Sequence, residues 1–78
     1  MESKIEMISA EADGVSVEFS LTENESKIYT ERFVISLTEL EGKTQGEQES
    51  YITYQVEVKK NKFISSRELA NSLSNLVG

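Results

Sequence analysis

The amino-acid sequence predicts a two-layer α+β fold, in which a four-stranded antiparallel β-meander is followed by one C-terminal helix packed on one face of the sheet (ββββα). Three observations support this fold. Apolar and polar residues alternate in several stretches before residue 58, as in half-buried antiparallel strands. An Asp-Gly pair separates the first two stretches and is typical of a tight hairpin. Near the C-terminus, apolar residues recur at the spacing of one helical face.

The first hairpin is centred on Asp13-Gly14, because these residues readily adopt the positive φ angles of a type I′ turn. Strands are expected near residues 4–12 and 15–22. With the two turn residues as the loop, most facing pairs on one side of the hairpin are apolar on both strands. The facing pairs are Ala12 with Val15, Ala10 with Val17, Ile8 with Phe19, and Glu6 with Leu21.

The third and fourth strands follow a polar turn at residues 22–26. Residues 27–37 alternate at their end and are rich in β-branched and aromatic residues, which favours a strand. A helix over 27–34 is the competing interpretation, because a period of 3.6 also fits the positions of Ile28, Glu31, Arg32 and Ile35. Residues 51–58 alternate throughout, with one apolar face, and predict the fourth strand. That face consists of Ile52, Tyr54, Val56 and Val58.

The C-terminal helix is predicted to begin at Ser65, because Ser65 and Glu68 have the spacing of a capping box. Leu69, Leu73 and Leu76 recur at i, i+4 and i+7 and form one apolar stripe. A helix of three turns is marginal in water, so this stripe is expected to pack on the sheet. The expected sheet partners are Ile8, Val17, Phe19, Phe33, Ile35, Tyr54 and Val56.

The amino-acid composition excludes several classes of functional site. The 78 residues fit one small domain (residues 1–78) and contain no Cys, His or Pro. This excludes disulfides, thiolate or imidazole metal sites, and catalysis that depends on Cys or His. No serine lies in a nucleophile motif, and no EF-hand loop or glycine-rich phosphate loop is present. We therefore expect neither an enzyme nor a bound cofactor.

The charge is unevenly distributed along the chain, whose net charge is −6. Residues 1–49 carry 12 acidic and 4 basic side chains, whereas residues 50–78 carry 2 acidic and 4 basic ones. An acidic surface repels nucleic-acid phosphates and attracts basic proteins, so direct nucleic-acid binding is not expected. No apolar run is long enough to cross a bilayer and the N-terminus does not resemble a secretory signal. A cytoplasmic protein is the expectation.

The candidate binding residues lie mainly in the segment 38–50, which is almost wholly polar and long for a hairpin connection. One interpretation is an acidic finger presented to a basic partner, and the other is a mobile hairpin tip that keeps the protein soluble. The candidate residues are Glu39, Glu41, Glu47 and Glu49, with Glu23 and Glu25 from the preceding turn. Tyr51, with Met7 and Val34, is expected on the uncovered sheet face as a second binding patch or a dimer contact.

These features predict a small acidic, non-enzymatic protein that acts by contact with a basic protein surface. In size, acidity and lack of catalytic residues it is similar in kind to small phage or mobile-element inhibitors, anti-CRISPR proteins among them. That resemblance implies a target in the host cytoplasm, namely the basic surface of a nucleic-acid-binding protein. The alternative is a structural or assembly subunit that self-associates, for example as a homodimer, through the open sheet face or an edge strand.

Overall fold

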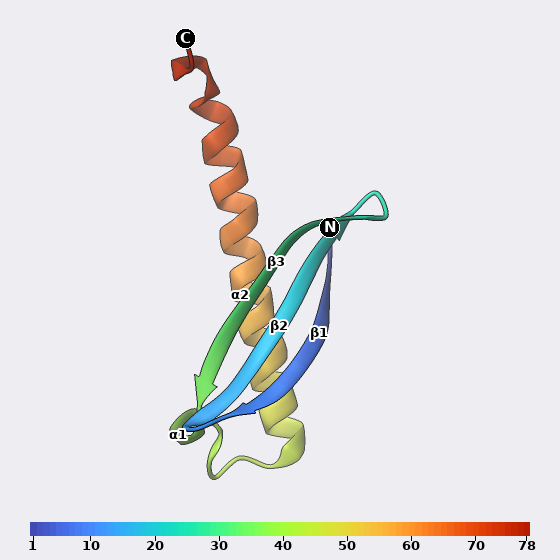
Figure 1. Cartoon of the computed structure of the whole chain (residues 1–78), viewed down its shortest axis with the longest axis vertical. Coiled ribbons are helices and arrows are strands. Elements are labelled where there is room, and N and C mark those ends of the chain that lie inside the picture. The colour runs from blue at the N-terminus through green and yellow to red at the C-terminus, as the bar shows by residue number, and fades with distance from the viewer.

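The computed structural model describes all 78 residues and has the element order βββαα (Figure 1). Its helices and strands are β1 (Glu2–Glu11), β2 (Gly14–Glu23), β3 (Ser26–Ser36), α1 (Leu37–Leu40) and α2 (Gln45–Ser72), followed by a short 3₁₀ turn, η1 (Ser74–Leu76). The three strands form one antiparallel sheet in the order β1-β2-β3. The α+β class with an antiparallel sheet and a C-terminal helix is therefore confirmed, and the fourth strand is not present.

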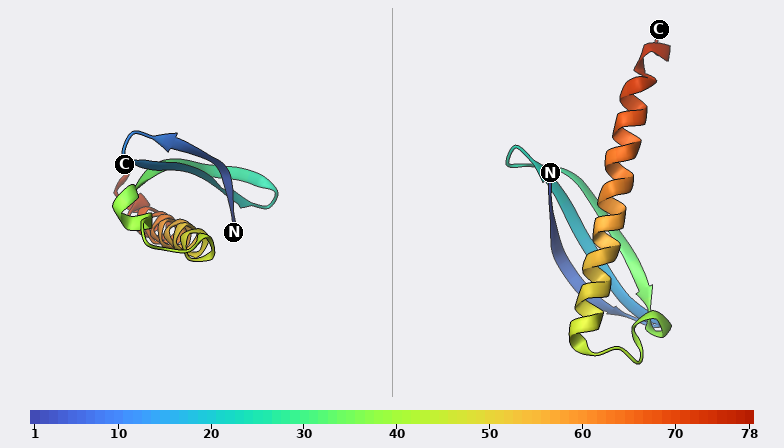
Figure 2. Two further views of the ribbon diagram at one scale, coloured as in Figure 1. Left: turned by 90° about the horizontal axis from the view of Figure 1, so that it is seen from below. Right: turned by 180° about the vertical axis from the view of Figure 1, so that it is seen from behind.

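The molecule has two layers, because the long helix α2 lies across one face of a curved sheet (Figure 2). The apolar residues Val17, Phe19 and Leu21 of the central strand are fully buried beneath it. The opposite sheet face is open and mostly polar. There the hydroxyls of Ser9 and Ser16 are 2.7 Å apart, and Ser20 donates to Glu6 at 2.6 Å.

The first hairpin exists as predicted, but its register differs by two residues. Glu11 pairs with Gly14, so that Ala12 and Asp13 form the turn rather than Asp13 and Gly14. Because side chains alternate with a period of two, this shift keeps the apolar residues of β2 on the buried face. A bulge between Ile5 and Met7 then changes which residues of β1 face the helix: the odd-numbered residues do so before the bulge and the even-numbered ones after it. It places Ile5 on the helix side, and it places Glu6 on the open face instead of opposite Leu21.

Gly14 is needed for close packing and not for a left-handed turn. Its φ is not positive, but a Cβ at this position would lie 2.2 Å from the carbonyl oxygen of Ile35 on β3. The non-glycine residues with positive φ are instead Asn24 (53°) and Glu25 (65°), which form the two-residue turn between β2 and β3. That turn has the type I′ pattern, and Asn is a favoured residue there.

The third strand confirms one of the two interpretations of residues 27–34. These residues belong to β3, which pairs with β2 along its whole length. Phe33 and Ile35 face the helix and contribute to the core. The strand ends at Ser36, which begins a capping box with Glu39 and starts the short helix α1.

Residues 51–58 are helical, so the prediction of a strand there is wrong. They lie within the 28-residue helix α2, which has no proline to interrupt it. Alternation places Ile52 and Val56 on one side, but these residues are also four apart and therefore share a helical face. Val56 packs in the core on that face, with Ile52 and Phe63 beside it, while Tyr54 points away and is exposed.

The predicted start of the C-terminal helix at Ser65 is also wrong, because Ser65 lies inside α2. The N-cap lies 21 residues earlier, at Thr44, which forms the capping box with Glu47. Thr44 accepts a hydrogen bond from the Glu47 amide at 3.2 Å, and its own amide donates to the Glu47 carboxylate at 2.9 Å. With α1, this helix replaces most of the long polar loop expected over 38–50.

The buried core consists of six apolar side chains: Val17, Phe19, Leu21, Ile35, Leu40 and Val56. Phe19 lies near its centre, with Tyr29 and Phe33 packed against its ring. Four of these six were predicted, and Leu40 joins them because α1 turns it inward. The expected contributions of Ile8, Tyr54, Leu69, Leu73 and Leu76 are not made, since all five side chains are largely exposed.

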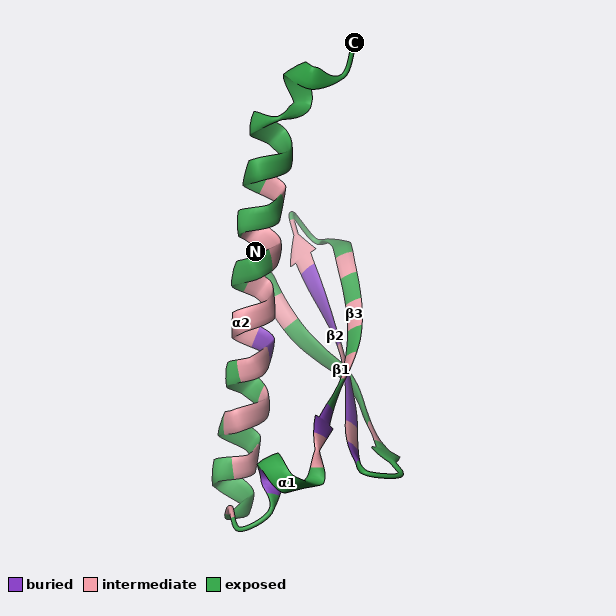
Figure 3. Ribbon diagram, turned by 90° about the vertical axis from the view of Figure 1, so that its left-hand side faces the viewer, coloured by how far each residue is buried: buried purple, intermediate pink, exposed green.

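The C-terminal part of α2 extends beyond the sheet (Figures 1 and 3). Every residue from Glu68 to Gly78 is exposed. A 28-residue helix is about 42 Å long, whereas a 10-residue strand spans about 33 Å. The radius of gyration is accordingly 15.3 Å, against roughly 11.5 Å for a compact domain of this size.

Candidate protein-binding surface

Four of the predicted site residues come together at one end of the molecule, which we call the acidic end: Glu39, Glu41, Glu47 and Glu49. They are contributed by α1, the residue after it, and the first two turns of α2. Two contacts hold α1 on α2. The Tyr51 hydroxyl donates to Glu39 at 2.7 Å, and the Gln48 side-chain amide donates to the Leu40 carbonyl at 3.0 Å.

Glu39 is the most firmly held carboxylate of the acidic end. Besides the Tyr51 hydroxyl, it accepts hydrogen bonds from the backbone amide of Ser36 at 2.9 Å and from the Ser36 hydroxyl at 3.1 Å. These donors, Tyr51 first, hold the pKa of Glu39 below its usual value, and the same contact raises the pKa of Tyr51. Glu39 is therefore a fixed negative charge that also joins β3, α1 and α2.

The other three carboxylates divide into one structural and two free groups. Glu47 caps α2, and the Thr44 amide lowers its pKa by donating to the charged form. Glu49 is approached only by the side-chain amide of Gln45, at 3.4 Å. Glu41 follows α1, is exposed, and forms no ion pair or side-chain hydrogen bond. Glu41 and Glu49 are thus the carboxylates best placed to meet a partner.

Two residues that the sequence did not single out for binding also lie at this end. The backbone carbonyl of Asp13 accepts from the Leu37 amide at 2.8 Å, which places the β1–β2 turn beside α1. Lys43 is the only basic residue between Arg32 and Lys59, and its ammonium lies 5.1 Å from the centre of the Tyr51 ring. Asp13 was interpreted only as a turn residue, and nothing in its local sequence pattern indicates that it lies near residues 39–49.

The remaining predicted site residues lie elsewhere. Glu23 and Glu25 occupy the β2–β3 turn region at the opposite end of the sheet, so they do not extend the acidic end (Figure 1). Glu23 is bound by both guanidinium nitrogens of Arg67, at 3.0 and 3.2 Å, which lowers its pKa. Met7 and Val34 do lie on the open sheet face, but Tyr51 does not, because it belongs to α2.

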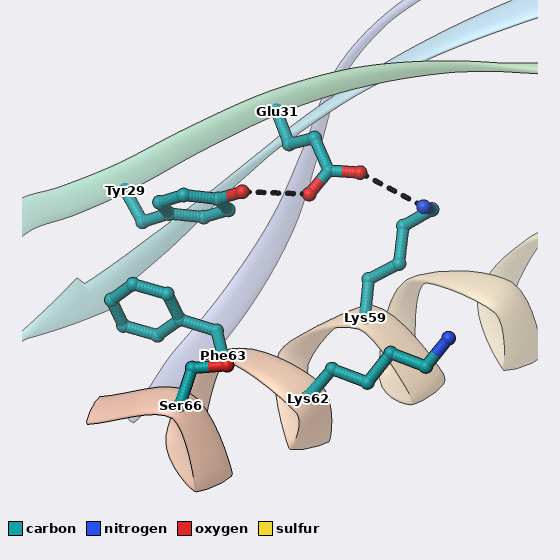
Figure 4. Close-up of a pocket in the computed structure, with 6 residues that line it drawn as sticks. All are labelled: Tyr29, Glu31, Lys59, Lys62, Phe63 and Ser66. Carbon is teal, nitrogen blue, oxygen red and sulfur yellow. Dashed lines mark hydrogen bonds and ion pairs between the residues drawn. The ribbon is translucent and has the colours of Figure 1, made fainter. Parts of the chain in front are cut away.

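A second candidate is a shallow groove between β3 and α2, of about 320 Å³. Figure 4 shows its lining residues, which are Tyr29, Glu31, Lys59, Lys62, Phe63 and Ser66. The Tyr29 hydroxyl donates to Glu31 at 2.7 Å, and Glu31 pairs with Lys59 at 2.8 Å. Lys59, more than Tyr29, lowers the pKa of Glu31. The groove's main polar groups therefore pair with one another and fasten α2 to the sheet.

The rings of Tyr29 and Phe63 strengthen this connection, because they stack with their centres 4.5 Å apart. Contacts of this kind stabilise a helix on a sheet.

Nowhere in the molecule do three or more acidic side chains converge closely enough to hold a metal ion. No helix is both long and apolar enough to cross a membrane.

Comparison with protein-family models finds no match to this chain, and searches of curated proteins and of solved structures find none either.

Proposed function

We propose that this chain is a small, non-enzymatic binding protein, and that its acidic end docks on a basic protein surface. The observation that carries the proposal is the acidic end itself. Four carboxylates from α1, the residue after it and the start of α2 lie in one segment that contains a single lysine, and two of the four are held in place by backbone donors. Charges fixed before binding cost little entropy to order, so the field they create is available at encounter.

The class of partner follows from this field. A surface that binds nucleic acid is basic, and a rigid array of carboxylates can occupy it in place of phosphates. The proposed activity is therefore steric and electrostatic inhibition of a nucleic-acid-binding protein, as in the small inhibitors of phages and mobile elements. Such binding needs no pocket, cofactor or reacting group.

The test is capture of partners from cells of the source organism by the immobilised protein. In the E41K/E49K variant both free carboxylates are reversed while the two helix caps remain intact. We expect capture to fall at least tenfold with this variant. A matched control, E2K/E25K, reverses two exposed carboxylates away from the acidic end and should capture as well as the original chain.

Two further measurements on the captured partner sharpen the result. Affinity should fall steeply between 50 and 500 mM salt, because exposed charges are screened over about one Debye length. Duplex nucleic acid added to the complex should displace the acidic protein. Binding that is indifferent to salt and equal for the two double variants would contradict the proposal.

A second candidate function, self-assembly, is favoured by a different observation. More large apolar side chains are exposed than are buried. Large exposed apolar patches are rare on monomeric proteins and commonly mark interaction sites.

A further inference from the structure

Lys43 is the one positive charge in the segment that forms the acidic end, and its side chain is held in a specific place. Residues 37–50 contain no other basic side chain. The Lys43 ammonium donates to the backbone carbonyl of Glu39 at 2.5 Å and lies 5.1 Å from the centre of the Tyr51 ring. Carbonyl oxygens and aromatic faces both attract ammonium groups. We call the Glu39 carbonyl and the Tyr51 ring the cation seat.

Only neutral groups hold Lys43 in the cation seat. The molecule contains five ion pairs, and none of them involves Lys43. The preceding residue, Gly42, has a φ of 79°, and a Cβ at that position would meet no atom within 4 Å beyond its chain neighbours. The loop between α1 and α2 is therefore open at this point (Figure 1). The Lys43 side chain can leave the seat without moving either helix.

A basic partner that docks at the acidic end meets Lys43 as a like charge, which weakens the attraction between the two surfaces. The seat suits a lysine of the partner as well as it suits Lys43, because both present the same ammonium group. Lys43 belongs to the same chain and therefore competes at a high effective concentration. A ligand that needs the seat to be free has its apparent affinity reduced by the fraction of chains in which it is free.

We propose that Lys43 is an intramolecular competitor, which occupies the cation seat until a lysine side chain of the basic partner displaces it. This inference rests on the proposed function, because it concerns a basic partner at the acidic end. It assigns contact with the partner's lysine to the Tyr51 ring and the Glu39 carbonyl. If Lys43 instead served only to hold α1 near α2, its removal would weaken binding, whereas removal of a competitor strengthens it.

The probe is a hexalysine peptide with blocked ends, titrated into the full chain by calorimetry at about 20 mM salt, where charges are little screened. Lys43→Gln empties the cation seat. The matched control, Lys62→Gln, makes the same change in net charge at an exposed lysine that forms no ion pair. We expect K43Q to bind hexalysine at least threefold more tightly than K62Q. Equal affinities, or weaker binding by K43Q, would overturn the role of Lys43.

The aromatic part of the cation seat is tested in the K43Q chain. Tyr51→Phe and Tyr51→Leu both remove the hydroxyl that donates to Glu39, but only the leucine variant also removes the ring. We expect the leucine variant to bind hexalysine at least twofold more weakly than the phenylalanine variant. In K43Q with Tyr51 intact, hexalysine should shift the proton signals of the Tyr51 ring. Equal affinities of the two variants, or unshifted ring signals, would overturn the assignment of the seat.

The E41K/E49K variant separates this inference from the proposed function. Docking at the acidic end requires E41K/E49K to bind hexalysine at least tenfold more weakly than the original chain. Equal binding by these two chains, or no binding by any variant, would overturn both proposals. A tenfold loss in E41K/E49K together with equal affinities of K43Q and K62Q would leave the proposed function standing and overturn only the competition by Lys43.

Discussion

The two parts of α2 differ in what holds them helical. Residues 45–67 lie on the sheet, with Val56 buried, Phe63 stacked on Tyr29, and Lys59 and Arg67 paired with sheet carboxylates. Residues 68–72 continue the same helix with no such contacts. The difference shows that the hydrophobic pattern of a helix does not by itself identify its buried face. The supported part buries only Val56, whereas Leu69 in the unsupported part is exposed, as are Leu73 and Leu76 after it.

The largest expected effect comes from comparing a carboxylate in the supported part with one at the C-cap of the helix, Leu73. Val56→Asp puts an unpaired charge at a position that is 3% exposed, which should cost roughly 3 kcal/mol or more. Leu73→Asp leaves the charge in water and should change the free energy of unfolding by less than about 0.5 kcal/mol. Urea denaturation at a few micromolar protein measures both.

Because Val56→Asp could prevent folding altogether, Val56→Ala is the quantitative variant. It should cost about 1–3 kcal/mol, since it removes two buried methyl groups and leaves a cavity. Comparable losses for Val56→Ala and Leu73→Ala would show that the monomer buries its C-terminal leucines after all.

The next effect concerns the boundary between the two parts, at Arg67. Amides of residues 70–76 should exchange with solvent at least tenfold faster than amides of residues 52–64, because helix ends open locally without global unfolding. Arg67→Ala removes the bidentate pair with Glu23 and should extend fast exchange back toward Phe63. Lys62→Ala is the control, because Lys62 forms no ion pair. Equal exchange in the two variants would contradict this role of Arg67.

The sequence identified the sheet far better than the helix, for a physical reason. Strand alternation in β1, β2 and β3 is reinforced by turn residues next to each strand, so pattern and turns agree. A two-residue error in the hairpin register did not matter for the buried face of β2. The close approach of Ile35 to Gly14, which leaves no room for a Cβ there, depends on the third strand and leaves no signal in the hairpin itself.

The start of the helix was misplaced because the Ser/Thr-x-x-Glu pattern of a capping box is not specific in this sequence. It occurs at Ser36–Glu39, at Thr44–Glu47 and at Ser65–Glu68 among other places, and of these three only the first two are caps. The choice between them depends on tertiary contacts of Val56 and Phe63, which require the helix to be continuous through residue 65. The uninterrupted segment 45–72 was the available signal, since it contains no proline and a single glycine.

The candidate site was predicted only in part, because the sequence shows which residues are neighbours along the chain but not which ones the fold brings to the same end. Glu39, Glu41, Glu47 and Glu49 are neighbours in the sequence and remain neighbours in the structure. Glu23 and Glu25 are separated from them by a full strand, and sequence order alone could not show that β3 carries them to opposite ends. The binding activity of these residues stays a prediction.

Acid should destabilise the supported part of the molecule specifically. Five carboxylates have pKa values below the ordinary 4.5, and all lie on the sheet, α1 or the first turn of α2: Glu6, Glu23, Glu31, Glu39 and Glu47. A lowered folded-state pKa contributes stability above about pH 4.5, and this is lost as pH falls through the folded values. Urea midpoints should therefore be constant from pH 7 to 5.5 and decrease below pH 4.5. A midpoint that rises on acidification would contradict these ion pairs and caps.

The smallest expected effect is a gain in stability that does not reach the end of α2 that projects beyond the sheet. Glu25 adopts a φ of 65° in the β2–β3 turn, a conformation that disfavours every residue with a Cβ and suits glycine. Glu25→Gly creates the Asn-Gly pair preferred in type I′ turns and should stabilise the fold by about 0.5–1 kcal/mol. Asn24→Gly should gain less, because asparagine already tolerates this region. Since the projecting end opens locally, Glu25→Gly should slow exchange at Val17 and Phe19 while leaving the amides of residues 70–76 unchanged. Slower exchange at both places would mean that the C-terminal end of α2 unfolds only with the sheet, and that the two parts of the helix form one cooperative unit.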